Sequence, residues 1–334
     1  MSFRSRTIGA LSSALYHGGL MKPVTAAAGR VRAPRGFPIL TFHRVNDEQD
    51  PFFPSLPTAV FAARMEHIAR HYVVLPVEEL VERMQSGHVP CNALALAFDD
   101  GYRDNLTHAA PILARHGLPA TIFLVTGCVG TPEMLWFDQL ALAFKTATRR
   151  HVSLAEGRML PLGSTAERLE ALAAALRHLK RLPDADRHRR VEQLIRALRP
   201  GLPERPKRFM LTWDEVEALR GLGFSVGAHT VSHPILSRLT PDRAWREIQG
   251  SKAAIEKTLG LTVRAFAYPN GGPDDYNETA TRLVREADFT CAVTTRHGLN
   301  GSGTPPLELR RGGPWEDHLP TFAVKLACYQ LAGS

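Results

Sequence analysis

The chain has 334 residues, a hydrophobic fraction of 44% and a formal net charge of +8. This size and composition predict a sizeable core, in one large α/β domain with insertions or in two smaller domains. No stretch approaches the roughly 20 apolar residues that span a bilayer, so no transmembrane segment is expected. The basic residues are dispersed and no nucleic-acid motif accompanies them, which argues against a nucleic-acid partner. An anionic glycolipid or peripheral contact with a membrane surface is the alternative that the charge allows.

Cysteine usage and the N-terminus bear on localisation. The four cysteines are far apart and form no CxxC pair: Cys91, Cys128, Cys291 and Cys328. We expect buried thiols in a reducing, cytoplasmic compartment, not a disulfide framework or a zinc knuckle. Residues 1–30 resemble a secretory signal weakly, but His17 and Lys22 interrupt its apolar part. Export or membrane attachment through residues 1–30 is the alternative.

Residues 1–35 are interpreted as an N-terminal extension, and strand and helix patterns alternate through residues 36–334. Before the middle of the chain, strands are expected at 38–42, 73–75, 94–98 and 120–125, and helices at 58–71, 77–85 and 109–116. Later, strands are expected at 224–228, 263–268 and 290–294, and helices at 212–220, 241–259, 277–287 and 320–331. This order predicts a largely parallel sheet or barrel wrapped by helices.

The segment from about 131 to 208 breaks this alternation, because it is rich in Ala, Leu and Arg and interrupted by prolines. We interpret it as an inserted helical subdomain. It follows the strand at 120–125, so it is expected to emerge at the rim of the sheet, either as a lid or wall of a groove or as a peripheral decoration.

Two adjacent carboxylates, Asp99 and Asp100, follow the apolar run 94–98 directly. Like charges so close repel each other, and such a pair tends to hold a proton or a cation. His229 and His233 follow the apolar run 224–228 in the same way. One carboxylate and two imidazoles are the ligand set of an open catalytic zinc site, which leaves the other carboxylate free to act as a base. Taken separately, the acidic pair also fits a turn with a helix cap, and the histidines fit a core imidazole and a surface one.

Two further strands end in polar or conformationally distinctive residues. His43 follows the strand at 38–42, and Tyr268 and Pro269 stand at the end of the strand at 263–268. In barrel-type α/β enzymes the active site lies at the carboxyl ends of the strands. The four strand ends are therefore expected to converge on one rim. On spacing alone, a structural role for His43 is equally consistent.

The segments Phe98-Asp99-Asp100-Gly101 and His229-Thr230-Val231-Ser232-His233 resemble the first two motifs of the polysaccharide deacetylases, carbohydrate esterase family four. The resemblance extends from about Pro38 to Ala332, outside the insertion. It implies a distorted (β/α) barrel with fewer than eight strands and a divalent metal, usually Zn²⁺, with Co²⁺, Ni²⁺ or Mn²⁺ as alternatives. It also implies hydrolysis of N-acetyl groups on a polysaccharide, oligosaccharide or lipid-linked sugar that contains N-acetylhexosamine, with release of acetate.

Carried over by this resemblance, Asp100, His229 and His233 are the metal ligands and Asp99 is the catalytic base. The last family motif, Leu-x-His, is absent near the C-terminus. Instead, the segment ending on His43 stands at the front of the chain, as in the circularly permuted branch of the family. His43 is therefore the expected general acid.

The third family motif, Arg-x-Phe-Arg-x-Pro-Tyr, is only partly kept. Ala267 and Asn270 replace its second Arg and its Tyr. The missing Arg normally orients the base, a role that Arg264, Arg310 or Arg311 is expected to supply. The resemblance places substrate or oxyanion contacts at the end of this motif: Tyr268, Pro269 and Asn270.

Two rival interpretations stay open from the sequence. One is a metal-dependent esterase or amidase with another substrate, such as an O-acetyl sugar. The other is an inactive carbohydrate-binding module, which would not need Asp99.

Overall fold

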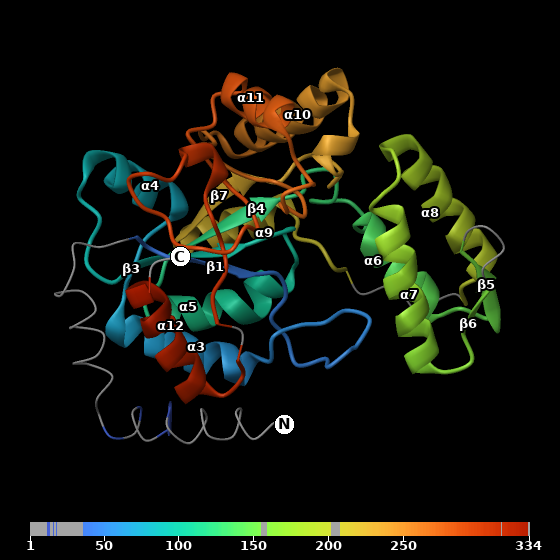
Figure 1. Ribbon diagram of the computed structural model, residues 1–334, viewed down its shortest axis with the longest axis horizontal. Coiled ribbons are helices and arrows are strands. Elements are labelled where there is room, and N and C mark those ends of the chain that lie inside the picture. Colours follow the sequence, from blue (N-terminus) through green and yellow to red (C-terminus); the bar gives the residue numbers. More distant parts are fainter. Residues whose placement is uncertain are drawn as a thin grey trace.

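A computed structural model of the chain describes residues 36–154, 159–201, 208–314 and 316–332, together with Ser12, Ser13, Tyr16 and Gly18 (Figure 1). The expected N-terminal extension, including the signal-like residues 1–30, lies outside the described residues apart from those four positions. Among the helices of the described part, none is long and apolar enough to cross a membrane.

A curled parallel sheet forms the centre of the molecule as a half-barrel (Figure 1). Its strand order is β1 (Ile39–Phe42), β3 (Ala93–Phe98), β4 (Ala120–Leu124), β7 (Phe224–Ala228), β8 (Ala265–Ala267) and β9 (Cys291–Val293). A short seventh strand, β2 (Val73–Val74), pairs with the first residues of β3. All of these pairs are parallel, which confirms the distorted barrel with fewer than eight strands.

The strands are continuous apolar runs because both faces of the sheet are covered. Every residue of β3 is buried. Leu94, Leu96 and Phe98 pack on one side, in the cluster that also holds residues of the surrounding helices. Ala95 and Ala97 point the other way, into a second cluster inside the curl. Small side chains on the inner face leave room for the curl to close.

Helices surround this sheet in the order that the sequence predicts. They are α3 (Thr58–His71), α4 (Val77–Ser86), α5 (Ala110–Arg115), α9 (Trp213–Gly221), α10 (Pro241–Leu259), α11 (Glu278–Glu286) and α12 (Leu319–Ala332). The helix expected at 109–116 starts earlier, with a π-helical turn at Asn105–Ala109. Such turns are frequent at functional sites, and here the Asn105 amide donates a hydrogen bond of 2.8 Å to the carbonyl of His43.

The gap between β9 and β1 is bridged by the segment 300–312, which does not form a regular strand. On one side, Leu309 N donates to Ala292 O at 2.8 Å. On the other side, Gly312 N donates to Ile39 O at 3.0 Å, and Phe37 exchanges two backbone hydrogen bonds with Asn300. This segment therefore continues the sheet and holds Arg311 against its inner face.

The segment predicted as a helical insertion contains α6 (Trp136–Lys145), α7 (Thr165–Leu179) and α8 (Asp184–Leu198), which stand beside the barrel in Figure 1. It also contains an antiparallel hairpin of β5 (His151–Ser153) and β6 (Met159–Pro161), so the expectation of helices alone was incomplete. The insertion has its own apolar core, which also takes in Phe52 and Phe53 from the loop after β1.

The cysteines differ from the expectation of buried thiols. Cys128 and Cys291 are buried, whereas Cys91 and Cys328 are exposed. Cys91 lies in the loop before β3 and Cys328 lies in α12 at the surface, so neither belongs to the core.

Candidate active site

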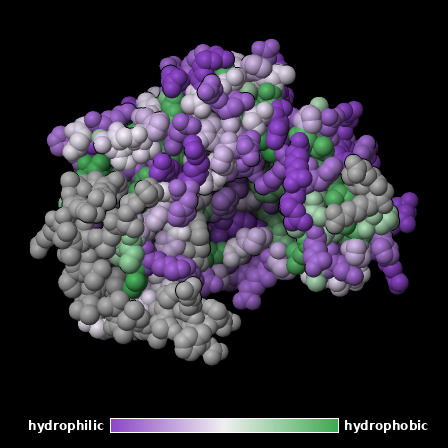
Figure 2. Space-filling view, in the orientation of Figure 1, coloured by the Kyte–Doolittle hydropathy of each residue, from purple (hydrophilic) through white to green (hydrophobic). Residues whose placement is uncertain are grey.

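A pocket of about 460 Å³ lies at the carboxyl ends of the strands, between the barrel and the insertion. Figure 2 shows the hollow between these two parts of the molecule. Its barrel side carries charged and polar side chains: His43, Asp99, Asp100, His229, His233, Asn270, Thr295 and Arg311. Its insertion side is mostly apolar, with Phe137, Ala141, Leu172 and Leu176, although Asp138 and Lys180 also line it.

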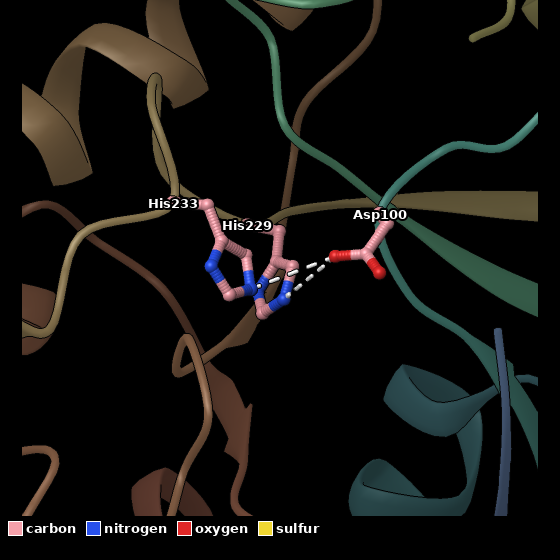
Figure 3. A group of neighbouring side chains, drawn as sticks. All are labelled: Asp100, His229 and His233. Atoms are coloured by element: carbon pink, nitrogen blue, oxygen red, sulfur yellow. Dashed lines mark ion pairs between the residues drawn. The ribbon is translucent and has the colours of Figure 1, made fainter. Parts of the chain in front are cut away.

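Asp100, His229 and His233 point toward one another (Figure 3). The Asp100 Oδ1 atom lies 3.7 Å from His229 Nε2 and 3.5 Å from His233 Nε2. One ligand atom from each side chain lies within 4.8 Å of the others, and all three residues are buried. Asp100 Oδ1 has no hydrogen-bond partner among the described residues. An unpaired buried carboxylate oxygen facing two imidazole nitrogens fits a divalent cation.

The electrostatics of this group point the same way. Burial, and then the neighbouring Asp99 carboxylate, raise the pKa of Asp100 well above its usual value. Burial lowers the pKa of His229 to about 4, and it lowers the pKa of His233 as well. Both imidazoles are therefore neutral, with a nitrogen lone pair available. A cation is the partner that allows Asp100 to stay ionised in this buried place.

The strand register orients His229. Its Nδ1 atom lies 2.7 Å from the carbonyl of Ala267 in the neighbouring strand β8. A carbonyl only accepts, so Nδ1 carries the proton and Nε2 keeps its lone pair toward Asp100.

Asp99 pairs with Arg311 next to this group. The Arg311 Nη1 atom donates to Asp99 Oδ1 at 2.7 Å, and Arg311 Nε donates to the carbonyl of Thr294 at 2.7 Å. Both side chains are buried. Burial by itself would raise the pKa of Asp99, but Arg311 and then His229 and His43 hold that pKa far below its usual value. Asp99 is therefore a carboxylate with a fixed orientation.

His43 lies at the outer side of Asp99. Its Nε2 atom is 3.9 Å from Asp99 Oδ2, and 54% of its side chain is exposed. Desolvation lowers the pKa of His43, while Asp99 opposes that shift. The structure thus brings His43, Asp99, Asp100, His229 and His233 to one pocket, as the strand-end argument predicts.

Of the three arginines considered for orienting Asp99, Arg311 is the one that contacts it. Arg264 precedes β8, at the opposite end of the strand from the pocket, and its exposed side chain pairs with Glu82 at 2.8 Å. The backbone of Arg310 exchanges two hydrogen bonds of 2.8 Å with the Asn300 side chain, and Arg310 does not line the pocket.

Of the three residues expected to contact substrate at the third motif, Asn270 lines the pocket, whereas Tyr268 and Pro269 do not. Tyr268 is fully buried, stacks on Tyr276 with ring centroids 4.4 Å apart, and donates its hydroxyl proton to the carbonyl of Leu307. Asn270 has a left-handed backbone at φ 59° and a buried Nδ2 that has no partner within the described part of the chain.

Sequence reasoning missed several residues around the pocket. The most prominent is Asp138 in the first turn of α6, which accepts a hydrogen bond of 2.8 Å from the hydroxyl of Tyr102. Burial raises the pKa of Asp138 to about 7. The run Trp136-Phe137-Asp138, two aromatic residues and an acid where the insertion begins, is the signal that could have marked this place.

Comparison with known proteins gives several relatives. YxkH of Bacillus subtilis (strain 168), named as a polysaccharide deacetylase, is 20% identical over 276 residues, which are 82% of this chain and 70% of YxkH. Among solved structures, the deacetylase PplD of Streptococcus pyogenes, in complex with acetate, is 21% identical with a TM-score of 0.56, over 83% of this chain and 92% of PplD. IcaB of Ammonifex degensii is 20% identical with a TM-score of 0.56, over 89% of this chain and 97% of IcaB. These structures share the fold.

The sequence profile described as polysaccharide deacetylase matches residues 86–292. This match covers more than half of the chain and includes Asp99, Asp100, His229 and His233, whereas His43 and Arg311 lie outside it. The protein belongs to the polysaccharide deacetylase family.

Proposed function

We propose that this protein is a metal-dependent hydrolase that removes N-acetyl groups from an N-acetylhexosamine-containing glycan or glycolipid and releases acetate. The observation that carries this proposal is the buried group Asp100, His229 and His233 with the Asp99–Arg311 ion pair beside it. Membership of the family supports deacetylation of a sugar polymer. The similarly folded PplD has been solved with acetate, the expected second product here.

Asp100, His229 and His233 would hold the divalent ion, with Zn²⁺ preferred and Co²⁺, Ni²⁺ or Mn²⁺ as alternatives. A bound ion of this kind supplies Lewis acidity, which activates water and polarises the amide carbonyl. Phe137 packs against the ring of His233 and helps to exclude bulk water from the ligand group.

Asp99 is the proposed base that takes a proton from the attacking water. Its Oδ1 atom is occupied by Arg311, which leaves Oδ2 directed toward the pocket and His43. Because the pKa of Asp99 is held low, the carboxylate stays ionised over a wide pH range.

His43 is the proposed acid that protonates the leaving amine. Its Nε2 atom faces Asp99 Oδ2, the oxygen that Arg311 does not contact, and its side chain lines the pocket. Asn270 is the proposed donor to the developing oxyanion, through its backbone N–H or its buried Nδ2, which has no partner among the described residues. The products are acetate and a free amino sugar.

The pocket also supports a lipid-linked sugar as one form of the substrate. Leu172 and Leu176 give the insertion side an apolar surface close to the charged residues, and exposed Lys180 lies at its edge. An amphipathic glycolipid with an anionic group would match both features. Cytoplasmic residence stays a prediction from the cysteine usage.

The test is metal analysis of the purified protein combined with acetate release from N-acetylglucosamine oligomers, lipid-linked N-acetyl sugars and O-acetylated sugars. We expect about one divalent ion per chain and acetate from the N-acetylated substrates. In Asp99→Asn we expect normal metal content and a fall of about 10²–10⁴-fold in kcat. Wild-type turnover in Asp99→Asn would refute the base assignment, and acetate from O-acetyl sugars alone would replace the amidase with an esterase.

A further inference from the structure

The two histidines of the ligand group are held in different ways. His229 donates from Nδ1 to the carbonyl of Ala267. His233 Nδ1 is buried and has no hydrogen-bond partner among the described residues. A metal-binding imidazole almost always donates its second N–H to a fixed acceptor, which sets the orientation of the ring. The His233 ring must therefore be oriented by other contacts.

Within the barrel, hydrogen bonds reach only the backbone of His233 among the described residues, and its ring meets the His229 ring edge-to-face, with centroids 4.8 Å apart. Thr230 Oγ1 accepts from the His233 N–H at 3.1 Å. Glu247 of α10 accepts from the N–H groups of Val231 at 3.0 Å and Ser232 at 2.8 Å. These bonds fix the loop, but they do not determine the rotation of the imidazole about its side-chain bonds.

The first turn of α6 supplies a second aromatic contact with the ring, from the side of the insertion. Phe137 packs edge-to-face on the His233 imidazole, with ring centroids 5.2 Å apart and an interplanar angle of 70°. The preceding residue, Trp136, donates from its indole N–H to the carbonyl of His233 at 3.2 Å. Arg187 of α8 lies over the Trp136 ring at 5.1 Å and is itself fully buried and paired with Asp184. Two helices of the insertion thus hold both the ring and the carbonyl of His233.

The next residue of the same turn reaches the other side of the ligand group. Asp138 accepts the hydroxyl proton of Tyr102 at 2.8 Å, and both side chains are buried. Tyr102 lies two residues after Asp100, in a turn where Asp100 has φ 77° and Gly101 has φ 84°. The hydrogen bond therefore ties the insertion to the turn that presents the carboxylate.

We propose that Trp136, Phe137 and Asp138 are positioning residues of the metal centre. Through them, the insertion fixes the orientation of His233 and of the turn that carries Asp100. This inference rests on the metal site of the proposed function and assigns part of that site to the insertion. Its consequence is that damage to the first turn of α6 weakens metal binding itself, and not only the binding of substrate.

The test measures Zn²⁺ affinity by competition with a fluorescent chelator, in the wild type and in Phe137→Leu and Trp136→Phe. Phe137→Leu removes the ring edge against His233, and Trp136→Phe removes the indole donor while keeping an aromatic ring over Arg187. The matched control is Phe144→Leu, in the same helix, because Phe144 is buried in the insertion core and does not line the pocket.

We expect each of the two variants to bind Zn²⁺ about tenfold more weakly, and Tyr102→Phe to weaken it in the same direction. The control should lose thermal stability without losing affinity. Unchanged affinity in Phe137→Leu and Trp136→Phe would overturn the inference alone. An equal loss in Phe144→Leu would also overturn it, because the effect would then be general loosening. A wild-type protein that binds no divalent ion would refute the proposed metal site, and this inference with it.

Discussion

The barrel and the insertion contribute to the same pocket in different ways. The barrel supplies charged and polar side chains, each placed where a strand ends or where the segment 300–312 bridges the sheet. The insertion supplies an apolar wall and the contacts of α6 with the ligand group. The proposed reactive groups thus lie at strand ends of the sheet, while the apolar wall of the pocket comes from a segment between β4 and β7.

The largest expected effect comes from removing a proposed metal ligand that the barrel supplies. His229→Ala takes away one of the two imidazoles facing Asp100. We expect the purified variant to lack the metal and kcat/KM to fall about 1000-fold or more, since Lewis-acid stabilisation amounts to several kcal/mol. His88→Ala, at an exposed position, is the control. A His229→Ala protein that keeps one ion per chain would refute His229 as a metal ligand.

The second effect concerns the ion pair of Arg311 with Asp99, the proposed base. Arg311→Met should lower kcat by about 100-fold, because Asp99 loses its orientation. Arg311 holds the pKa of Asp99 down, so its loss raises that pKa, and activity should disappear at a higher pH as the solution is acidified. Arg264→Met, whose side chain pairs with Glu82 far from the pocket, should keep the wild-type pH profile. Equal profiles for both variants would contradict this assignment.

The third effect tests the apolar wall. Leu176→Ala enlarges the pocket on the insertion side without touching the ligand group. We expect KM for a lipid-linked substrate to rise about tenfold, since each buried methylene contributes about 0.8 kcal/mol, and Zn²⁺ affinity to stay unchanged. Leu222→Ala, at an exposed position outside the pocket, is the control. A change in metal affinity in Leu176→Ala would contradict the assignment of Leu176 to the substrate wall alone.

The smallest effect on activity concerns a buried histidine away from the pocket. Burial lowers the pKa of His67 in α3 to about 4, so the folded state keeps it neutral. Its unfolded-state value is 6.5, so stability is lost as the pH falls from 6.5 toward 4. The free energy of unfolding of His67→Gln should therefore fall less between pH 6.5 and pH 4 than that of the wild type. The difference should reach up to roughly 3 kcal/mol, at 1.36 kcal/mol for each pKa unit. Chemical denaturation at several pH values between 4 and 6.5 measures this free energy. An equal pH dependence in the variant and the wild type would contradict the lowered pKa of His67.

Much of the barrel could be predicted from the sequence because its signals are local. Each strand is an apolar run, and both faces of the sheet are buried. The residues directly after β3 and β7 had to reach the same rim, since parallel strands end on the same side. Asp100, His229 and His233 are therefore expected to lie together from the sequence alone.

The rest depends on contacts that no local pattern contains. Arg310 and Arg311 look alike in sequence, and the hydrogen bonds of the segment 300–312 with β1 and β9 decide which one enters the sheet. Tyr268 follows β8 and lies within the segment of the third family motif, yet it packs on Tyr276 in the core. The hairpin of β5 and β6 has strands too short to show a period, and the partner of Asp138 lies 36 residues away.

Several backbone conformations around the pocket are energetically unfavourable, which has a consequence for engineering. Asp100, Thr230, His233 and Asn270 all have positive φ angles, between 56° and 77°. This conformation costs a residue with a β-carbon about 1–2 kcal/mol, although Asn and Asp adopt it more readily, and glycine avoids it. Selection of random variants for heat resistance alone would therefore enrich glycine at these turns. Glycine at Asp100 or His233 would remove a proposed metal ligand, so improved stability should be sought on the outer helices instead.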